Sequence, residues 1–318
     1  MSDQRLSWMR GVLLVPLLLS APFSCGLAQG AGDDDVKVLR ETLVLIEEVK
    51  AFGRTLGVEP SEALSQSSRE KPARSMLWLW LQRLGTIALH ASLDIRLEIQ
   101  FSATKEELPL EYLYLSGSYS AYFRQGNQFG DPRSVATVDF ARDSMLIKVK
   151  TVLHEDMHDD RNFDLPWEDE ESIITPLGAL AALEFFKHKA DRANTERALE
   201  GIEEERTLSR ELVAIARTAD QLFKIGAPSE SRRKVLELVR SSRRYARWFE
   251  SHLEHQDADR ALEAKISHDL AYYKYYDRIV SMYENRGELR TIIRDLKKVP
   301  QGSTGEALER FLAELERQ

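Results

Sequence analysis

The stretch TVLHEDMHDDRNFDLPWEDEES, residues 151–172, places a helix with metal-binding chemistry at the centre of the expected fold. Within it, HEDMH at residues 154–158 has the pattern H-E-x-x-H. On a helix, residues four apart lie on one face, so His154 and His158 can bind one metal ion from the same side. Glu155 follows the first histidine and can reach a water bound to that metal. The pattern therefore predicts a helix that carries a zinc site.

A third ligand for the same ion is present in the acidic run EDEE, residues 168–171. Glu171 comes thirteen residues after His158. Two neutral imidazoles and one carboxylate leave zinc one open position, which a catalytic site needs for water. We therefore expect His154, His158 and Glu171 to bind Zn²⁺ and Glu155 to act as the catalytic base of a peptidase, with a peptide as substrate.

The charge of Asp156 keeps other interpretations open. The inner positions of such motifs are usually uncharged because the helix is packed, whereas Asp156 is acidic and two more aspartates follow at residues 159–160. Either this turn of the helix is more exposed to water than is usual for such motifs, or the site has decayed and no longer functions as a metal site. The alternatives are a catalytically decayed, peptidase-like binding module of the cell envelope and a structural helical protein with an accidental motif. Against them, the apolar run MLIKVKTVL, residues 145–153, suits a helix that enters a core.

The N-terminal residues 1–28 have the composition of an export signal. Two arginines precede the apolar run GVLLVPLLLSAPF, residues 11–23, which is too short to span a bilayer. Gly26 and Ala28 supply small residues at the −3 and −1 positions of a cleavage site, so we expect an exported protein of the periplasm or cell envelope. Cys25 is a rival site for lipidation, and attachment to a membrane is expected only through it or through an uncleaved anchor.

The overall composition limits the metal ligands and the partners. Cys25 is the only cysteine, so after cleavage any metal must be held by histidines and carboxylates. The net charge is −8 and there is no basic block, which argues against nucleic acid as a partner. The oligomeric state is left open.

The expected fold class is α+β, mostly α and zincin-like, with a small sheet before the H-E-x-x-H helix and a helical C-terminal region. Residues 93–101, LDIRLEIQF, alternate strictly between apolar and polar and predict a strand. The dense Leu and Trp of residues 76–89 fit either a buried helix or a strand. Because proline is tolerated only in a first helical turn, we expect the next helix to begin or kink near Pro176.

The remaining expectations concern segments and domains. Further strands are expected at residues 111–123 and 134–140, and helices at residues 36–56, 178–189, 191–225, 231–255, 262–283, 287–296 and 304–315. The expected divisions are a signal peptide at residues 1–28, an N-terminal α/β region at 29–143, zinc-site helices at 144–190 and a helical C-terminal region at 191–318.

The zinc segment resembles that of the exported "predicted aminopeptidase" family of bacteria, which are gluzincin-type zinc metallopeptidases. The family pattern is H-E-x-x-H followed by an Asn-Glu-Ser-x-x-Thr segment at the spacing of residues 170–175 here. Residues 272–300 are similar to the C-terminal helical segment of that family, and residues 113–123 are faintly similar to a Tyr-rich segment. Glu170 replaces the family's Asn, and Asp156, Asp159 and Pro176 also depart from the pattern.

The resemblance implies a second stabiliser for the developing oxyanion, because gluzincins often use a Tyr or His from elsewhere in the chain. The candidates are Tyr119, Tyr122, Tyr272, Tyr273, Tyr275 and Tyr276. Carboxylates that orient the imidazoles are sought among Asp159, Asp160, Asp164 and Glu168. An aminopeptidase also needs acidic groups for the free α-amino group, and Glu168, Asp169 and Glu170 are the candidates. The other histidines, at positions 90, 188, 252, 255 and 268, are expected to have structural roles only.

Overall fold

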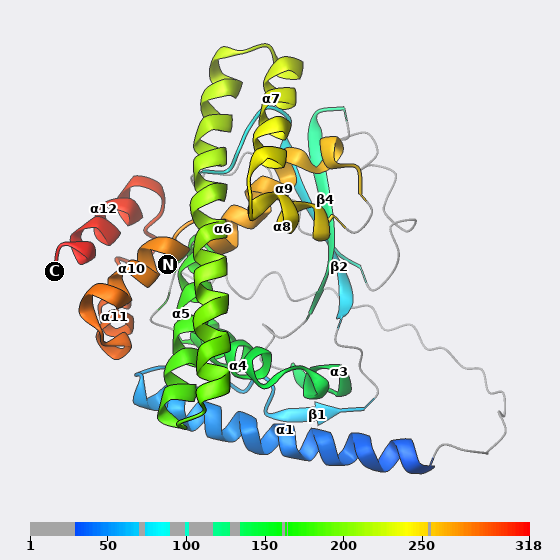
Figure 1. Cartoon of the computed structure of the whole chain (residues 1–318), viewed down its shortest axis with the longest axis vertical. Coiled ribbons are helices and arrows are strands. Elements are labelled where there is room, and N and C mark those ends of the chain that lie inside the picture. Colours follow the sequence, from blue (N-terminus) through cyan, green and yellow to red (C-terminus); the bar gives the residue numbers. More distant parts are fainter. Residues whose placement is uncertain are drawn as a thin grey trace, which may run out of the picture.

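The structure is a computed structural model of the whole chain and describes residues 29–69, 74–89, 99–101, 117–127, 134–160, 163, 165–253 and 256–318. These residues form long helices beside a small set of strands (Figure 1), so the predicted α+β, mostly α class is confirmed. The predicted signal peptide and Cys25 lie outside the described residues. No helix in the described ranges combines the length and apolar character that a membrane crossing requires.

The larger sheet has three antiparallel strands in the order β3-β2-β4. Strand β2 is Arg74–Arg83, β3 is Ile99–Phe101 and β4 is Tyr119–Asn127. Leu79 of β2 lies opposite Phe123 of β4 in the register. The Leu- and Trp-rich segment is therefore a strand rather than a helix as far as Arg83. Residues 93–98 and 111–116, where strands were also predicted, lie outside the described residues.

A second, two-stranded sheet joins β1, Gln66–Ser68, in parallel to β5, Val135–Thr137. The strand predicted at residues 134–140 is wrong beyond Thr137, where the helix α3, Val138–Arg142, begins. The reason is a helix cap, because the Thr137 hydroxyl accepts a hydrogen bond from the Phe140 amide. A cap of this kind ends the strand and starts the helix within one residue.

The metal-motif helix is α4, Met145–Asp159, and the next helix is α5, Trp167–His188. The prediction that a helix begins near Pro176 is wrong, because α5 starts nine residues earlier and contains the proline. The turns around Pro176 are apolar and buried almost without interruption, and this packing outweighs the missing amide hydrogen bond. As a consequence, Glu171 lies on a rigid helix and not in a loop.

The helix predicted at residues 36–56 is confirmed as α1, Gln29–Thr55, and Gly57 ends it with a φ of 83°.

Two predicted helices of the C-terminal region are each divided into two. The segment 231–255 forms α7 and α8, and the segment 262–283 forms α9 and α10. The C-terminal helices are α6, Arg192–Ile225; α7, Pro228–Ser241; α8, Tyr245–Ser251; α9, Ala258–Tyr273; α10, Tyr276–Arg286; α11, Leu289–Leu296; and α12, Gly305–Glu316.

The arrangement of these helices fixes the motif helix from two sides. Helix α4 packs against α5, and α1 runs across the other side of α4 (Figure 1). Helix α9 lies against β4 and also contacts α5 and α6. The apolar residues of these elements form one continuous core. The metal motif is therefore held between rigid, packed elements, as a preorganised site requires.

Candidate metal centre

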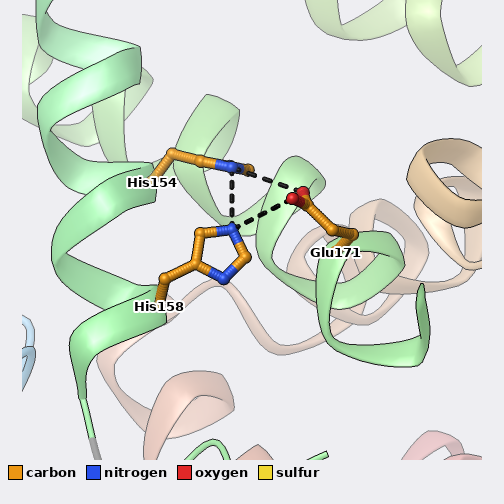
Figure 2. Close-up of side chains that lie close together, drawn as sticks. All are labelled: His154, His158 and Glu171. Carbon is orange, nitrogen blue, oxygen red and sulfur yellow. Dashed lines mark hydrogen bonds and ion pairs between the residues drawn. The ribbon is translucent and has the colours of Figure 1, made fainter. Parts of the chain in front are cut away.

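The side chains of His154 and His158 on α4 converge with Glu171 on α5 (Figure 2). The two Nε2 atoms are 3.1 Å apart. Nε2 of His154 is 3.4 Å from Oε2 of Glu171, and Nε2 of His158 is 3.3 Å from Oε1 of the same carboxylate. Three predicted ligands from two helices therefore meet at one point.

These distances are those that separate the ligands of a tetrahedral zinc ion. Ligand atoms about 2.0–2.1 Å from zinc at tetrahedral angles are about 3.3 Å from one another. Two imidazole nitrogens that face each other share at most one proton, and Oε2 of Glu171 is buried without a hydrogen-bond partner among the described residues. A cation between the three groups would satisfy all of these lone pairs, so the donor set fits a metal.

Helical spacing explains how α5 reaches the motif. Glu171, Thr175 and Gly178 follow one another at intervals of four and three, so they share one face of α5. A Cβ atom added at Gly178 would lie 3.1 Å from Cβ of His154. The absence of a side chain at Gly178 therefore allows α5 to approach α4 closely beside the first ligand.

A second carboxylate contacts the other nitrogen of His158. Oε2 of Glu170 is 3.4 Å from Nδ1 of this imidazole. Carboxylates at this position orient a ligand histidine and raise its basicity. Sequence reasoning sought this residue at Asp159, Asp160, Asp164 or Glu168 and missed Glu170, which directly precedes Glu171 in the chain. Asp160 instead bonds Lys297 and the Glu59 amide, and Asp164 lies outside the described residues.

Asp156 is buried, so the expectation of a wetter turn is wrong. Its side chain is 2% exposed, and Oδ1 lies 3.2 Å from Nζ of Lys50 on α1. The same oxygen accepts hydrogen bonds from the amide and the hydroxyl of Ser61. The acidic inner position therefore ties α1 and the following loop to α4, which gives Asp156 a structural role.

Burial and neighbouring charges shift the pKa values of the acidic groups at the site. Burial raises the pKa of Glu155 above its ordinary value, although the two histidines act in the opposite direction. Burial would also raise the pKa of Glu171, but the charges of the nearby His158 and His154 outweigh it and lower that pKa. An ionised Glu171 suits a ligand, and a raised pKa brings Glu155 closer to the range of a general base at neutral pH.

Two of the tyrosines considered as oxyanion stabilisers, Tyr272 and Tyr122, have hydroxyl groups with different hydrogen-bond partners. The Tyr272 hydroxyl accepts a hydrogen bond of 2.6 Å from Arg124. Burial would lower the pKa of Arg124, but Tyr272 and then Glu171 raise it, so this arginine lies within electrostatic range of the candidate ligand Glu171. By contrast, the Tyr122 hydroxyl bonds the His252 carbonyl. Arg124 was not found from the sequence, because no motif surrounds it.

Two of the three acidic candidates for binding a substrate amino group have other partners. Asp169 accepts a hydrogen bond of 2.9 Å from Thr304 and is 2% exposed. Glu170 contacts His158. Asp169 and Glu170 therefore make contacts within the protein itself.

Comparisons with models of protein families, with curated proteins and with solved structures found no match.

Proposed function

We propose that this protein is a zinc-dependent peptidase, with His154, His158 and Glu171 as the metal ligands and Glu155 as the general base. The observation that carries the proposal is the convergence of three ligand atoms at 3.1–3.4 Å from one another. A zincin-like architecture, with a sheet before the motif helix, belongs to the same proposal. So does membership of the exported family that the zinc segment resembles, with a location in the periplasm or envelope.

The residues divide the chemistry among them. Bound zinc would lower the pKa of a water and polarise the scissile carbonyl. Glu155 takes the proton of the attacking water and later delivers it to the leaving amine. Glu170 holds the His158 ring in the orientation that presents Nε2 to the site. Asp156 ties α4 to α1, and Gly178 allows α5 to pack closely against α4. The two helices α4 and α5 therefore keep these groups in place.

The experiment that tests the proposal combines metal content with peptide hydrolysis. Purified protein should contain zinc near one equivalent, and Glu171→Ala should remove it. Glu155→Gln should retain zinc but lose peptide hydrolysis, because the amide cannot accept the proton. Protein that binds no zinc when it is supplied, or a Glu155→Gln variant of undiminished activity, would contradict the proposal.

The alternative of a decayed, non-enzymatic module makes a different prediction. It was motivated by the charge of Asp156, for which the ion pair with Lys50 supplies a structural reason. In a decayed site, His154→Ala would leave the melting temperature unchanged in the presence of zinc. In a live site, zinc should raise the melting temperature of the wild type and not that of the variant.

A further inference from the structure

Two buried polar atoms lie one turn apart on α5, at the candidate metal centre, and neither has a hydrogen-bond partner among the described residues. They are Oε2 of Glu171 and Oγ1 of Thr175, and each residue is 6% exposed. Buried polar atoms without a partner are rare in native proteins, so each one points to a missing interaction. An ionised carboxylate only accepts hydrogen bonds, whereas a hydroxyl has a proton to donate. The two atoms are therefore complementary.

The Thr175 hydroxyl departs from the usual behaviour of a helical threonine. Such a hydroxyl commonly bonds the carbonyl three or four residues earlier, as Thr218 of α6 bonds the Ala214 carbonyl at 2.9 Å. Thr175 makes no bond of this kind to the backbone that the structure describes. This is so although Pro176 has no amide hydrogen to offer the Ser172 carbonyl. The hydroxyl proton of Thr175 is therefore not used by the helix itself.

The position of the His154 side chain places Thr175 in the wall of the metal centre. The base of this side chain lies against Gly178, where an added Cβ would be 3.1 Å from Cβ of His154. Its tip reaches Glu171, with 3.4 Å between Nε2 and Oε2 (Figure 2). Glu171, Thr175 and Gly178 share one face of α5, so the His154 side chain passes the position of Thr175 on its way between the other two.

The chemistry of a ligand carboxylate leaves room for one more partner. A carboxylate has about four lone-pair sites on its two oxygens, so a bound cation does not use up its capacity to accept hydrogen bonds. Carboxylates that bind metals are themselves hydrogen-bonded, and these partners fix the orientation of the ligand. Glu170 provides a contact of this kind for His158. A corresponding donor to Oε2 of Glu171 is absent from the part of the chain that the structure describes.

We propose that the Thr175 hydroxyl donates a hydrogen bond to the Glu171 carboxylate when the metal is bound, and so holds this ligand in its binding orientation. Because the two residues are neighbours one helical turn apart, the bond requires a change of side-chain torsion angles only. Thr175 is a positioning residue, since it acts through Glu171. The assignment rests on the proposed metal site but not on peptide hydrolysis.

The test compares two substitutions of Thr175 by their zinc affinity, measured in competition with a chromophoric chelator. Thr175→Val keeps the shape of the side chain and removes the hydroxyl. It should bind zinc about tenfold more weakly than the wild type, or weaker still, as is typical when a partner of a metal ligand is lost. Thr175→Ser keeps the hydroxyl and should stay within threefold of the wild type.

The melting temperature in the presence of a chelator separates this role from a purely structural one. Removal of a buried hydroxyl that has no partner costs no hydrogen bond, so metal-free Thr175→Val should melt at or above the temperature of the wild type. Zinc should raise its melting temperature less than that of the wild type. If the hydroxyl instead served the Ser172 carbonyl, Thr175→Val would melt lower with and without zinc at unchanged zinc affinity, which would overturn the inference.

The matched control is Ser172→Ala, which removes another buried hydroxyl of α5. Ser172 is 0% exposed and its hydroxyl donates to the Asp169 carbonyl at 3.0 Å. Ser172→Ala should therefore lower the melting temperature but change the zinc affinity less than threefold. Wild-type zinc affinity in Thr175→Val, or equally weak binding in Thr175→Ser, would contradict the positioning role.

The outcomes also separate this inference from the proposed peptidase. Zinc binding that depends on the Thr175 hydroxyl, without any peptide hydrolysis by the zinc-loaded protein, would support the positioning role and refute the peptidase. Zinc-dependent hydrolysis together with undiminished zinc affinity in Thr175→Val would do the reverse. A wild-type protein that binds no zinc would refute both.

Discussion

Asp156, at an inner position of the metal motif, forms a buried ion pair with Lys50 of α1, with 3.2 Å between Oδ1 and Nζ. Lys50 also donates to the carbonyls of Ser61 and Ala63, at 2.5 and 2.8 Å. The segment that follows α1 is thus attached to the motif helix through two charged side chains. The acidic residue that looked unfavourable for a metal site is part of the framework that supports the candidate ligands.

Asp156→Asn should destabilise the protein, because it leaves the ammonium of Lys50 buried without its counter-charge. Removal of one partner of a buried pair costs about 3–5 kcal/mol, and the hydrogen bonds that Asn retains place the expected loss near the lower limit. Urea unfolding measures it. Glu41→Gln, which disrupts an exposed pair with Lys37, is the control and should cost less than about 1 kcal/mol. A loss for Asp156→Asn no larger than this control would contradict the structural role.

Sequence reasoning succeeded where the signal is local and periodic. The two histidines share a helical face by spacing alone, and the carboxylate at position 171 follows at a distance that a short connection can bridge. It failed where tertiary packing decides. Pro176 is tolerated inside α5 because the surrounding turns are buried, and the partner of Asp156 is more than a hundred residues away. Arg124 and His268 meet only through the packing of β4 against α9, so no pattern within the sequence joins them.

Gly178→Ala should weaken metal binding although alanine is the better helix former. The added Cβ would lie 3.1 Å from Cβ of His154, so the first ligand or the helix must move. A small displacement of one ligand of three should lower zinc affinity about tenfold, the lower end of the range for changes around a metal site. Competition with a chromophoric chelator measures this affinity.

The matched control for this experiment is Gly201→Ala in α6, where no described atom beyond the adjacent backbone of its own helix lies within 4 Å of an added Cβ. That variant should gain up to about 1 kcal/mol of stability from helix propensity and bind zinc like the wild type. Unchanged zinc affinity in Gly178→Ala would show that the two helices can separate without disturbing His154.

His268 should make the stability of the protein depend on pH between about 3 and 6.5. Burial lowers its pKa to about 3, whereas an unfolded histidine titrates near about 6.5. In this window the unfolded chain binds a proton that the folded chain does not, so stability falls as the pH falls, by up to about 1.4 kcal/mol per pH unit. Asp269, Lys265 and Arg124 are the charged groups that act on this ring.

The measurement compares urea unfolding of the wild type and His268→Phe at pH 4.5 and pH 6. The pH dependence of the variant should be smaller than that of the wild type, because one of the titrating groups is missing. His188→Phe, at an exposed histidine, should retain the wild-type dependence. Equal pH dependence in wild type and His268→Phe would mean that the ring gains its proton without cost in the folded protein.

Glu170 should tune the affinity for zinc without being a ligand. Its Oε2 lies 3.4 Å from Nδ1 of His158, on the side of the ring opposite to the nitrogen that faces Glu171. Loss of such a partner typically costs about 10–100-fold in metal affinity, so Glu170→Ala should still take up one equivalent of zinc, but more weakly by that factor. Glu171→Ala should lose the site. Glu168→Ala removes an acidic residue from the same first turn of α5, so it controls for the general loss of charge and should change the affinity less than threefold. If Glu168→Ala and Glu170→Ala weakened binding equally, the effect would come from the charge of the helix terminus and not from the contact with His158.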